Sequence, residues 1–337
     1  MSDREKLRVG LVGCGWHGST LAQAIARSQG LLLVACADPD AAAANRAATN
    51  AAHVSTHASS EALLAEAEVD AIVIATPHHL LAPVALTAIR AGKHVLAEKP
   101  IALSEPEAAE VAAAVAQAGV TYMSGYSFRF SMGRHVHDLL AGGAVGDIRG
   151  ITGAIGIGPL NDGWIAYPET GGGPLLYLGC HLIDLALWLL RDEPVEVFAH
   201  MQLRPDTGVD DTTALQIRFA KGALAQFLVT QAASTFFYEL GIHGGAGTIE
   251  LRGRNFLQFE LEVSSTVLPA YAEPTIIRPA VRGDNITMML VPELDAFATA
   301  VYERCQPAIT VADGRQVLRI LDAVRESGRA GKPITLH

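Results

Sequence analysis

The chain has 337 residues, and 25 basic against 35 acidic side chains give it a formal net charge of −10. Hydrophobic residues make up 50 % and charged residues 18 %, a composition that supplies a packed core and excludes a chain that is disordered throughout. The length predicts about two domains, and the acidic balance disfavours nucleic acid or an anionic membrane surface as the main partner.

The N-terminal segment, MSDREKLRVG, is charged and lacks the apolar core of a secretory signal. No apolar run approaches the roughly 18 residues of a membrane span. The 4 cysteines are widely spaced without a CxxC pair, and the local histidine pairs have no third ligand at a recognisable spacing, so we expect no metal site. These features predict a soluble, reduced, cytoplasmic protein with no membrane partner.

The first predicted strand, Leu7–Val12, leads directly into a glycine-rich turn, GCGWHG at 13–18, and then into a helix over 20–26. The first glycine permits the tight turn, the second lets the backbone approach a pyrophosphate, and the third lets the helix pack closely on the strand. The turn residues that we expect to contact the cofactor are Gly13, Gly15, Trp16, His17 and Gly18.

A second buried strand, Leu31–Ala37, ends at Asp38, which stands 20 residues after Gly18 (38 − 18). A carboxylate there can accept hydrogen bonds from the adenosine ribose and would repel a 2′-phosphate, so the pattern favours NAD over NADP. The alternative is that Asp38 only shapes the turn Asp38-Pro39-Asp40. Strand, glycines, helix, strand and acid in this order predict a dinucleotide-binding unit.

The alternation of strands and helices continues to residue 124 and predicts a parallel sheet with helices on both faces. Ligands of such sheets bind at the carboxyl ends of the strands, so the polar residues at these ends should converge with the glycine turn. The further cofactor contacts that we expect are Thr76, Pro77, His78, Glu98 and Lys99. The strands are expected over 69–75, 93–97 and 120–124, and the helices from 59 or 60 to 65 and over 82–91 and 104–118.

Lys99 allows two interpretations. A lysine is usually a solvated surface residue. One that ends a strand, precedes Pro100 and lies beside the dinucleotide can hydrogen-bond the cofactor ribose or a substrate hydroxyl, and we favour this second interpretation. The Lys99–Pro100 peptide bond is also a candidate for the cis form.

Beyond residue 147 the pattern changes to short strands separated by turn signals, which predicts a second, β-rich domain. Alternation of apolar and polar residues gives its sheet one covered and one exposed face, and the exposed face is a natural dimer surface. The strands are expected over 148–157, 195–203, 212–219, 223–230, 239–243, 247–251 and 256–263. An irregular loop is expected over 269–279, helices over 292–304 and 314–325, and a short strand over 333–336.

The segment Gly171–Leu190, GGGPLLYLGCHLIDLALWLL, places three polar side chains on an apolar background. Tyr177, His181 and Asp184 have the spacing i, i+4 and i+7, which puts them on one face of a helix. With a glycine loop before it, such a helix could direct an imidazole into a cleft. Taken alone, the segment fits a core helix with one hydrogen-bonded histidine better than it fits a site.

The chain resembles the Gfo/Idh/MocA oxidoreductases in the order of its motifs, which are GxGxxG at 13–18, Asp38, Thr76-Pro77, Glu98-Lys99-Pro100 and GGG…GCHLID at 171–184. The resemblance covers essentially the whole chain and implies an α/β protein with an N-terminal Rossmann domain, 1–124. It implies a C-terminal α/β domain, 125–337, with a large open, mostly antiparallel sheet. It also implies a nicotinamide cofactor, homodimers or homotetramers, and sugars, cyclitols or related polyols as substrates.

Carried over to this sequence, the resemblance makes His181 the catalytic histidine, Lys99 the lysine of the EKP motif and Asp184 the trailing acid. Tyr177 departs from the family, because the motif usually has an aspartate there that assists the histidine. A phenol is neutral at pH 7. Either Tyr177 hydrogen-bonds the substrate oxygen as a further catalytic group, or it only packs and Asp184 orients His181.

Four more positions follow from the resemblance. Tyr126 and Arg129 lie in the segment that resembles the family's hinge, where they could contact substrate, although Arg129 could equally be a structural ion-pair partner. His78 replaces the asparagine that commonly follows Thr-Pro, and Trp164 lacks the arginine that often follows it. The substrate contacts that we expect are Tyr126, Arg129, Trp164 and Asp184.

The leading hypothesis for the function is hydride transfer between a nicotinamide cofactor and a secondary alcohol or its ketone, with His181 as general base and Lys99 orienting the hydroxyl. One alternative is an enzyme that keeps NAD bound and recycles it within a turnover while cleaving a glycoside. The other is a dinucleotide-sensing binding protein without turnover, against which the presence of both Lys99 and His181 argues.

Overall fold

The computed structural model describes residues 5–160, 163–255, 258–279 and 286–336. By its internal packing the chain divides into two compact units, Met1–Ser127 with Gly283–Gln316 and Phe128–Arg282 with Val317–His337. This division differs from the expected 1–124 and 125–337, because a late segment of the chain returns to the first unit. A return of this kind leaves no local signal in composition or periodicity.

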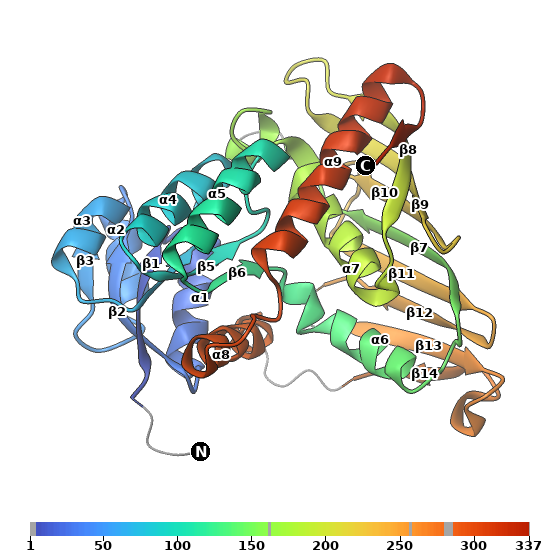
Figure 1. Ribbon diagram of the computed structural model, residues 1–337, viewed down its shortest axis with the longest axis horizontal. Coiled ribbons are helices and arrows are strands. Elements are labelled where there is room, and N and C mark those ends of the chain that lie inside the picture. Colours follow the sequence, from blue (N-terminus) through green and yellow to red (C-terminus); the bar gives the residue numbers. More distant parts are fainter. Residues whose placement is uncertain (1–4, 161–162, 256–257, 280–285, 337) are drawn as a thin grey trace. The chain divides into compact units, whose positions relative to one another are not determined.

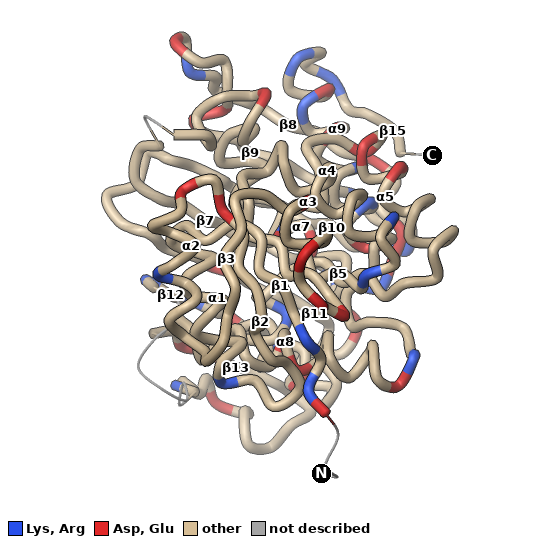
Figure 2. The backbone as a smooth tube through the Cα atoms, turned by 90° about the vertical axis from the view of Figure 1, so that its left-hand side faces the viewer, with Lys and Arg blue, Asp and Glu red and all other residues tan. Residues whose placement is uncertain are grey.

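The first unit is built around a parallel six-stranded sheet in the order β3-β2-β1-β4-β5-β6. Strands β2 and β3 carry no lysine, arginine, aspartate or glutamate and are drawn wholly tan in Figure 2. The parallel pairing and the order of the six strands confirm the predicted Rossmann arrangement. The strands are β1 (Leu7–Val12), β2 (Leu31–Ala37), β3 (Ser55–His57), β4 (Ala71–Ile74), β5 (His94–Glu98) and β6 (Tyr122–Gly125).

Helices connect these strands (Figure 1), and a side chain caps the first turn of two of them. Ser59 begins α3 by accepting a hydrogen bond from the Ala62 amide at 3.2 Å. At the start of α5 the Ser104 hydroxyl donates to Glu107 at 3.0 Å and caps no backbone amide. The helices are α1 (Trp16–Arg27), α2 (Ala41–Ala48), α3 (Ser60–Glu66), α4 (His78–Arg90) and α5 (Glu105–Ala118).

The returning segment contributes helix α8 (Thr287–Glu303), which packs on α1. The Asp295 carboxylate accepts hydrogen bonds from the Ser28 hydroxyl at 2.5 Å and from the Gln29 amide at 2.9 Å. A side chain at Gly30 would place its Cβ 2.4 Å from that of Ala298. These contacts explain why α8 belongs to the first unit despite its position late in the sequence.

The second unit contains a nine-stranded sheet in the order β14-β13-β12-β11-β7-β10-β9-β8-β15. Only β7 and β10 pair in parallel among these strands, so the prediction of a mostly antiparallel sheet is confirmed. The strands are β7 (Ile148–Gly156), β8 (Pro194–Leu203), β9 (Asp210–Phe219), β10 (Leu224–Thr230), β11 (Phe237–Gly244), β12 (Gly247–Gly253), β13 (Phe259–Ser265), β14 (Thr275–Ile277) and β15 (Ile334–Thr335).

One face of this sheet is covered by helices, as the alternation of buried and exposed residues in β9 and β10 indicates. Helix α9 packs against β8, where the Ser327 hydroxyl accepts a hydrogen bond from the Ala199 amide at 3.0 Å. The longer helices and turns of this unit are α6 (Met132–Ala141), the 3₁₀ turn η2 (Trp164–Ala166), the π-helical turn η3 (Leu175–Gly179), α7 (Cys180–Leu190) and α9 (Val311–Ala330), which begins in the first unit.

Short elements escaped the sequence-based prediction. Helix α2 lies in an alanine tract and starts at Asp40, whose carboxylate accepts the Ala42 amide at 2.9 Å, and β14 lies inside the expected loop 269–279. Residues 256–257 of an expected strand fall outside the described residues. No helix of the described chain is long and apolar enough to span a bilayer.

Candidate active site

The glycine turn has the three properties expected of it, each at a different glycine. Gly13 adopts φ +88°, and a Cβ on it would lie 2.6 Å from the Ala75 carbonyl. A Cβ on Gly18 would lie 1.9 Å from the Gly13 carbonyl oxygen. Apart from Gly15 itself and its two chain neighbours, no described atom lies within 4 Å of the place where a Cβ on Gly15 would stand. The turn therefore leaves open space at the N-terminus of α1, where free amides and the helix dipole attract an anion.

The position of Asp38 is compatible with both roles considered for it, shaping its own turn and contacting a ribose. One carboxylate oxygen accepts the Cys14 amide at 2.7 Å, and the other accepts the Asp40 amide at 2.8 Å. Asp38 thus shapes its own turn and also ties the end of β2 to the glycine turn. Each oxygen can accept a second hydrogen bond, which leaves acceptors for the two hydroxyls of a ribose.

His17 and Glu98, both expected as cofactor contacts, form a pair that the sequence did not indicate. His17 Nε2 lies 2.7 Å from Glu98 Oε1. Burial opposes ionisation of Glu98, but the charge and hydrogen bond of His17 and the neighbouring Lys99 outweigh it and hold the pKa of Glu98 below its ordinary value. The pair holds an ionised carboxylate, hydrogen-bonded to His17, at the end of β5.

The other expected residues of the first unit also lie at strand ends. Lys99 follows β5 and precedes Pro100 through a cis peptide bond, as expected. Thr76 follows β4, and its buried hydroxyl has no hydrogen-bond partner among the described residues. Pro77 caps α4, and His78 is its buried first residue. Tyr126 is fully buried, which differs from the expected substrate contact.

The predicted single helical face of the second unit is interrupted by a π-helical turn. Tyr177 lies in η3 and is half-buried, whereas His181 and Asp184 lie in α7. π-Helical turns occur often at functional sites, because the extra residue shifts the side chains that follow. His181 is 6 % exposed and Asp184 is 0 % exposed, so Asp184 is enclosed by protein instead of lying open to a substrate as expected.

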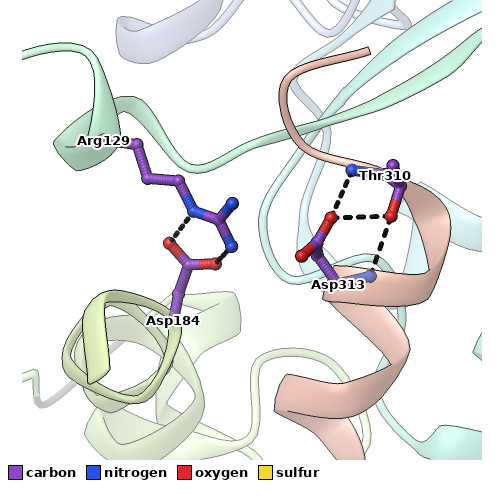
Figure 3. A network of polar contacts seen from close by, with 4 residues as sticks. All are labelled: Arg129, Asp184, Thr310 and Asp313. Carbon is purple, nitrogen blue, oxygen red and sulfur yellow. Dashed lines mark hydrogen bonds and ion pairs between the residues drawn. The ribbon is translucent and has the colours of Figure 1, made fainter. Parts of the chain in front are cut away.

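Arg129 and Asp184 form a buried, two-pronged ion pair, drawn in Figure 3. Arg129 Nε donates to one carboxylate oxygen at 2.9 Å and Nη2 donates to the other at 2.5 Å. The guanidinium also lies 5.6 Å from the ring centre of Trp188. Of the two alternatives for Arg129, the structural ion pair is the one that the geometry favours.

Phe128 holds the imidazole of His181 from one side. The two rings are stacked with their centres 4.1 Å apart and their planes 13° apart. Phe128 is itself buried and contacts Tyr238 of β11, with 5.9 Å between the ring centres. The side chain of His181 is therefore fixed in orientation by packing. Phe128 lies within the segment that resembles the family's hinge, but nothing in the sequence linked it to a residue 53 positions later (181 − 128).

Tyr177 faces an aromatic partner. The indole of Trp164 packs edge-on against the phenol, with the ring centres 6.3 Å apart and the planes at 88°. The Thr170 hydroxyl donates to the Trp164 carbonyl at 2.6 Å and holds this turn. Trp164 and Tyr177 thus form an aromatic edge next to the helix that carries His181.

Asp210 is a buried residue at this site that the sequence did not single out. Its Oδ2 accepts the Leu175 amide at 3.0 Å and the Thr213 hydroxyl at 3.1 Å. Burial raises the pKa of Asp210 to about 6, against the opposing effect of these hydrogen bonds and of Arg325. An acid at the first residue of a strand has no distinctive sequence signal, which is why the prediction missed it.

Comparison with known proteins gives two family matches. Residues 7–126 match a model described as an oxidoreductase family with an NAD-binding Rossmann fold, and residues 134–250 match one described as the GFO/IDH/MocA C-terminal domain. The first match contains the glycine turn, Asp38 and Lys99, and the second contains Tyr177, His181 and Asp184.

Two curated relatives illustrate the range of these matches. A 1,5-anhydro-D-fructose reductase from Ensifer adhaerens is 33 % identical, over 75 % of this chain and 76 % of the relative. An inositol 2-dehydrogenase from Rhizobium meliloti strain 1021 is 25 % identical, over 98 % of this chain and 99 % of the relative.

Solved structures share the fold over nearly the whole chain. An oxidoreductase domain protein from Kribbella flavida superposes with a TM-score of 0.88 at 24 % identity, covering 99 % of this chain and 100 % of that one. A levoglucosan dehydrogenase in complex with NADH and levoglucosan gives a TM-score of 0.88 at 24 % identity, covering 98 % and 99 %.

Proposed function

The chain belongs to the Gfo/Idh/MocA family of oxidoreductases, and we propose that it transfers a hydride between NAD and a secondary alcohol or ketone of a sugar, cyclitol or related polyol. The observation that carries the proposal is the glycine turn with Asp38 bonded across it. An open anion site and a carboxylate suited to a ribose diol lie together there.

The residues of the first unit fit a dinucleotide. The amides at the start of α1 would hold the pyrophosphate, since Gly15 leaves the approach open. The Thr76 hydroxyl, which has no partner among the described residues, would find one in the cofactor. Asp38 disfavours a 2′-phosphate, so we expect NAD to be preferred, although one relative is named an NADP(+)-dependent D-xylose 1-dehydrogenase. The preference is tested by comparing kcat/KM for the two cofactors.

When bound, the nicotinamide accepts or supplies the hydride. In the oxidative direction His181 takes the proton of the substrate hydroxyl on its ring nitrogen while the carbon of that alcohol loses hydride, which leaves a ketone and a reduced cofactor. Lys99 orients the hydroxyl and stabilises negative charge that develops on its oxygen. Phe128 keeps the imidazole plane fixed, so that little reorientation is required before proton transfer.

We assign Tyr177 a hydrogen bond to the substrate. Both oxygens of Asp184 accept hydrogen bonds from Arg129, and this pair supports α7 below His181. A neutral phenol cannot supply the charge of the usual aspartate, but it can donate to a substrate oxygen. The Trp164 indole beside it favours a substrate that presents an apolar C–H face.

The test is a panel of polyols, sugars and cyclitols with NAD, followed at 340 nm for wild type, His181→Ala, Lys99→Ala and Tyr177→Phe. His135→Ala is the matched control, because His135 is an exposed histidine of the same unit. We expect the first two variants to lose at least a hundredfold in kcat/KM and the control to lose less than twofold. If none of the three site variants loses more than about tenfold, the acid–base assignment is wrong.

The same panel separates the alternatives. Cleavage of a glycoside without net formation of NADH would favour an enzyme that recycles bound NAD. Tight binding of NAD without turnover of any compound would favour a dinucleotide-sensing protein.

We also propose a homodimer or homotetramer, formed through the uncovered face of the nine-stranded sheet. Leu224 and Leu228 of β10 lie on the same exposed face of the strand, four residues apart, and are 57 % and 39 % exposed. Light scattering of wild type and of Leu224→Asp would test this, with a shift towards monomer expected in the variant.

A further inference from the structure

Asp210 lies under the glycine segment that precedes the helix of His181. It is the first residue of β9 and is 3 % exposed. Its Oδ2 accepts the amide of Leu175, the residue with which η3 begins, at 3.0 Å. Because the amides at the start of a helical segment lack partners within it, a carboxylate there both satisfies one amide and interacts favourably with the segment's dipole.

The glycine segment is shaped to admit this carboxylate. Gly173 has φ +77°, and a Cβ on it would lie 2.5 Å from Asp210 Oδ1. A Cβ on Gly171 would lie 2.3 Å from the Cα of Ile165. Side chains at these positions would push the segment away from Asp210 and from the turn that contains Trp164. The glycines therefore allow the backbone to pass between the two.

The backbone of Asp210 is connected through Gln231 to Leu160, in the segment that follows β7. Its carbonyl accepts the Gln231 side-chain amide at 3.2 Å, and the carbonyl oxygen of that side chain accepts the Leu160 amide at 2.9 Å. Arg204 Nη1 donates to the Leu160 carbonyl at 2.9 Å. One network of hydrogen bonds thus connects the start of η3 with Leu160.

The charge on Asp210 is costly. The groups that face it are the Thr213 hydroxyl, the Leu175 amide and Arg325 of α9, and Arg325 is shared with Asp322 at 3.3 Å. Desolvation outweighs them, so the pKa is raised to about 6. An asparagine would have nearly the same shape without this penalty. Charges that are retained at a cost to stability are more typical of functional positions than of purely structural ones.

We propose that Asp210 is a positioning residue, whose ionised carboxylate holds the glycine segment and the first turn of η3 and so fixes Tyr177 and His181 for the substrate. This role rests on the proposed function. Protonation of Asp210 weakens its hydrogen bond to Leu175 and releases the segment. Activity is therefore lost at acidic pH through two groups, His181 and Asp210.

The test compares Asp210→Asn with Asp211→Asn, the neighbouring half-buried carboxylate, as control. In Asp210→Asn we expect kcat to fall at least tenfold at pH 7.5, with no loss in the temperature of unfolding. In a plot of the logarithm of kcat/KM against pH, the acid limb should have a limiting slope of 2 in wild type and of 1 in Asp210→Asn. The slope falls because the variant has lost one of the two groups whose protonation stops activity. An unchanged slope and kcat would overturn the role.

Hydrogen exchange provides a readout that does not depend on finding a substrate. The backbone amides of the peptide that contains residues 171–179 should exchange at least tenfold faster in Asp210→Asn than in wild type. Their exchange rate in Asp211→Asn should equal that of wild type. Equal exchange in all three proteins would overturn the proposed hold on the segment. Faster exchange with an unchanged kcat would overturn the positioning role. If no polyol is oxidised by wild type, the proposed function fails, and the exchange experiment still decides whether Asp210 holds the segment.

Discussion

Replacement of Arg129 by methionine should destabilise the second unit by about 3–5 kcal/mol, because it leaves the Asp184 carboxylate buried without its partner. The estimate rests on two hydrogen bonds of 2.9 and 2.5 Å between side chains that are 6 % and 0 % exposed. Methionine retains much of the apolar volume, so the loss reports mainly on the charge. The measurement is the free energy of unfolding of this unit from urea denaturation at pH 7.5.

The chain offers a matched control for this change. Arg134 pairs with Asp138 at 2.8 Å, but these side chains are 64 % and 55 % exposed. Arg134→Met should therefore cost no more than about 0.5 kcal/mol. The double variant Arg129→Met with Asp184→Leu should recover part of the loss, since no unpaired charge remains. If Arg129→Met costs less than about 1 kcal/mol, or no more than the control, the buried pair does not stabilise α7 as we infer.

Three further predictions concern the glycine turn, Glu98 and Asp210. Gly15→Ala should leave the temperature of unfolding within about 2 °C of wild type but weaken NAD binding at least tenfold in calorimetric titrations. Gly18→Ala should destabilise the first unit by about 1–3 kcal/mol, because its Cβ would clash with a backbone carbonyl. Glu98→Gln should weaken NAD binding about tenfold, because it removes the charged partner of His17. An unchanged affinity for NAD would contradict a role of this pair in holding the cofactor. The pKa of Asp210 is raised from 3.8 to about 6, so the folded state binds the extra proton in this window, and unfolding measurements should show wild type losing about 3 kcal/mol relative to Asp210→Asn as the pH rises from about 4 to about 6. Parallel stability curves for the two proteins would contradict this sign.

The sequence was informative where the signal is local. The glycines of the turn, the apolar strand before them and Asp38 lie within 32 residues (7–38) and share one βαβ unit, so their spacing predicts both the fold and the place of the cofactor. The parallel sheet followed from the alternation of strands and helices, and the β-rich second domain from its turn signals and residue alternation, whereas the mostly antiparallel arrangement of the second sheet was implied by the resemblance to the family. His181 was identified through a motif that resembles a family and through the other motifs of the chain, since the spacing of its helix alone favoured a core helix.

The contacts that hold the site residues in place could not be predicted from local sequence patterns. Arg129 and Asp184 are 55 residues apart, His17 and Glu98 are 81 apart, and Asp210 is 35 residues from Leu175. Each pair forms because tertiary packing brings together residues of different elements, and neither hydrophobic period nor capping pattern records such a contact. The π-helical turn η3 interrupts the predicted helix, and its first residue, Leu175, is bonded to Asp210 of a distant strand.

The most direct test of the proposed activity is the transfer of deuterium from the carbinol carbon of a labelled polyol to NAD, followed by mass spectrometry in a single turnover. We expect deuterium in the reduced nicotinamide with wild type, and a rate at least a hundredfold lower with His181→Ala but not with His135→Ala. Reduced cofactor without deuterium, or an equal rate in the His181 variant, would contradict hydride transfer with His181 as the base.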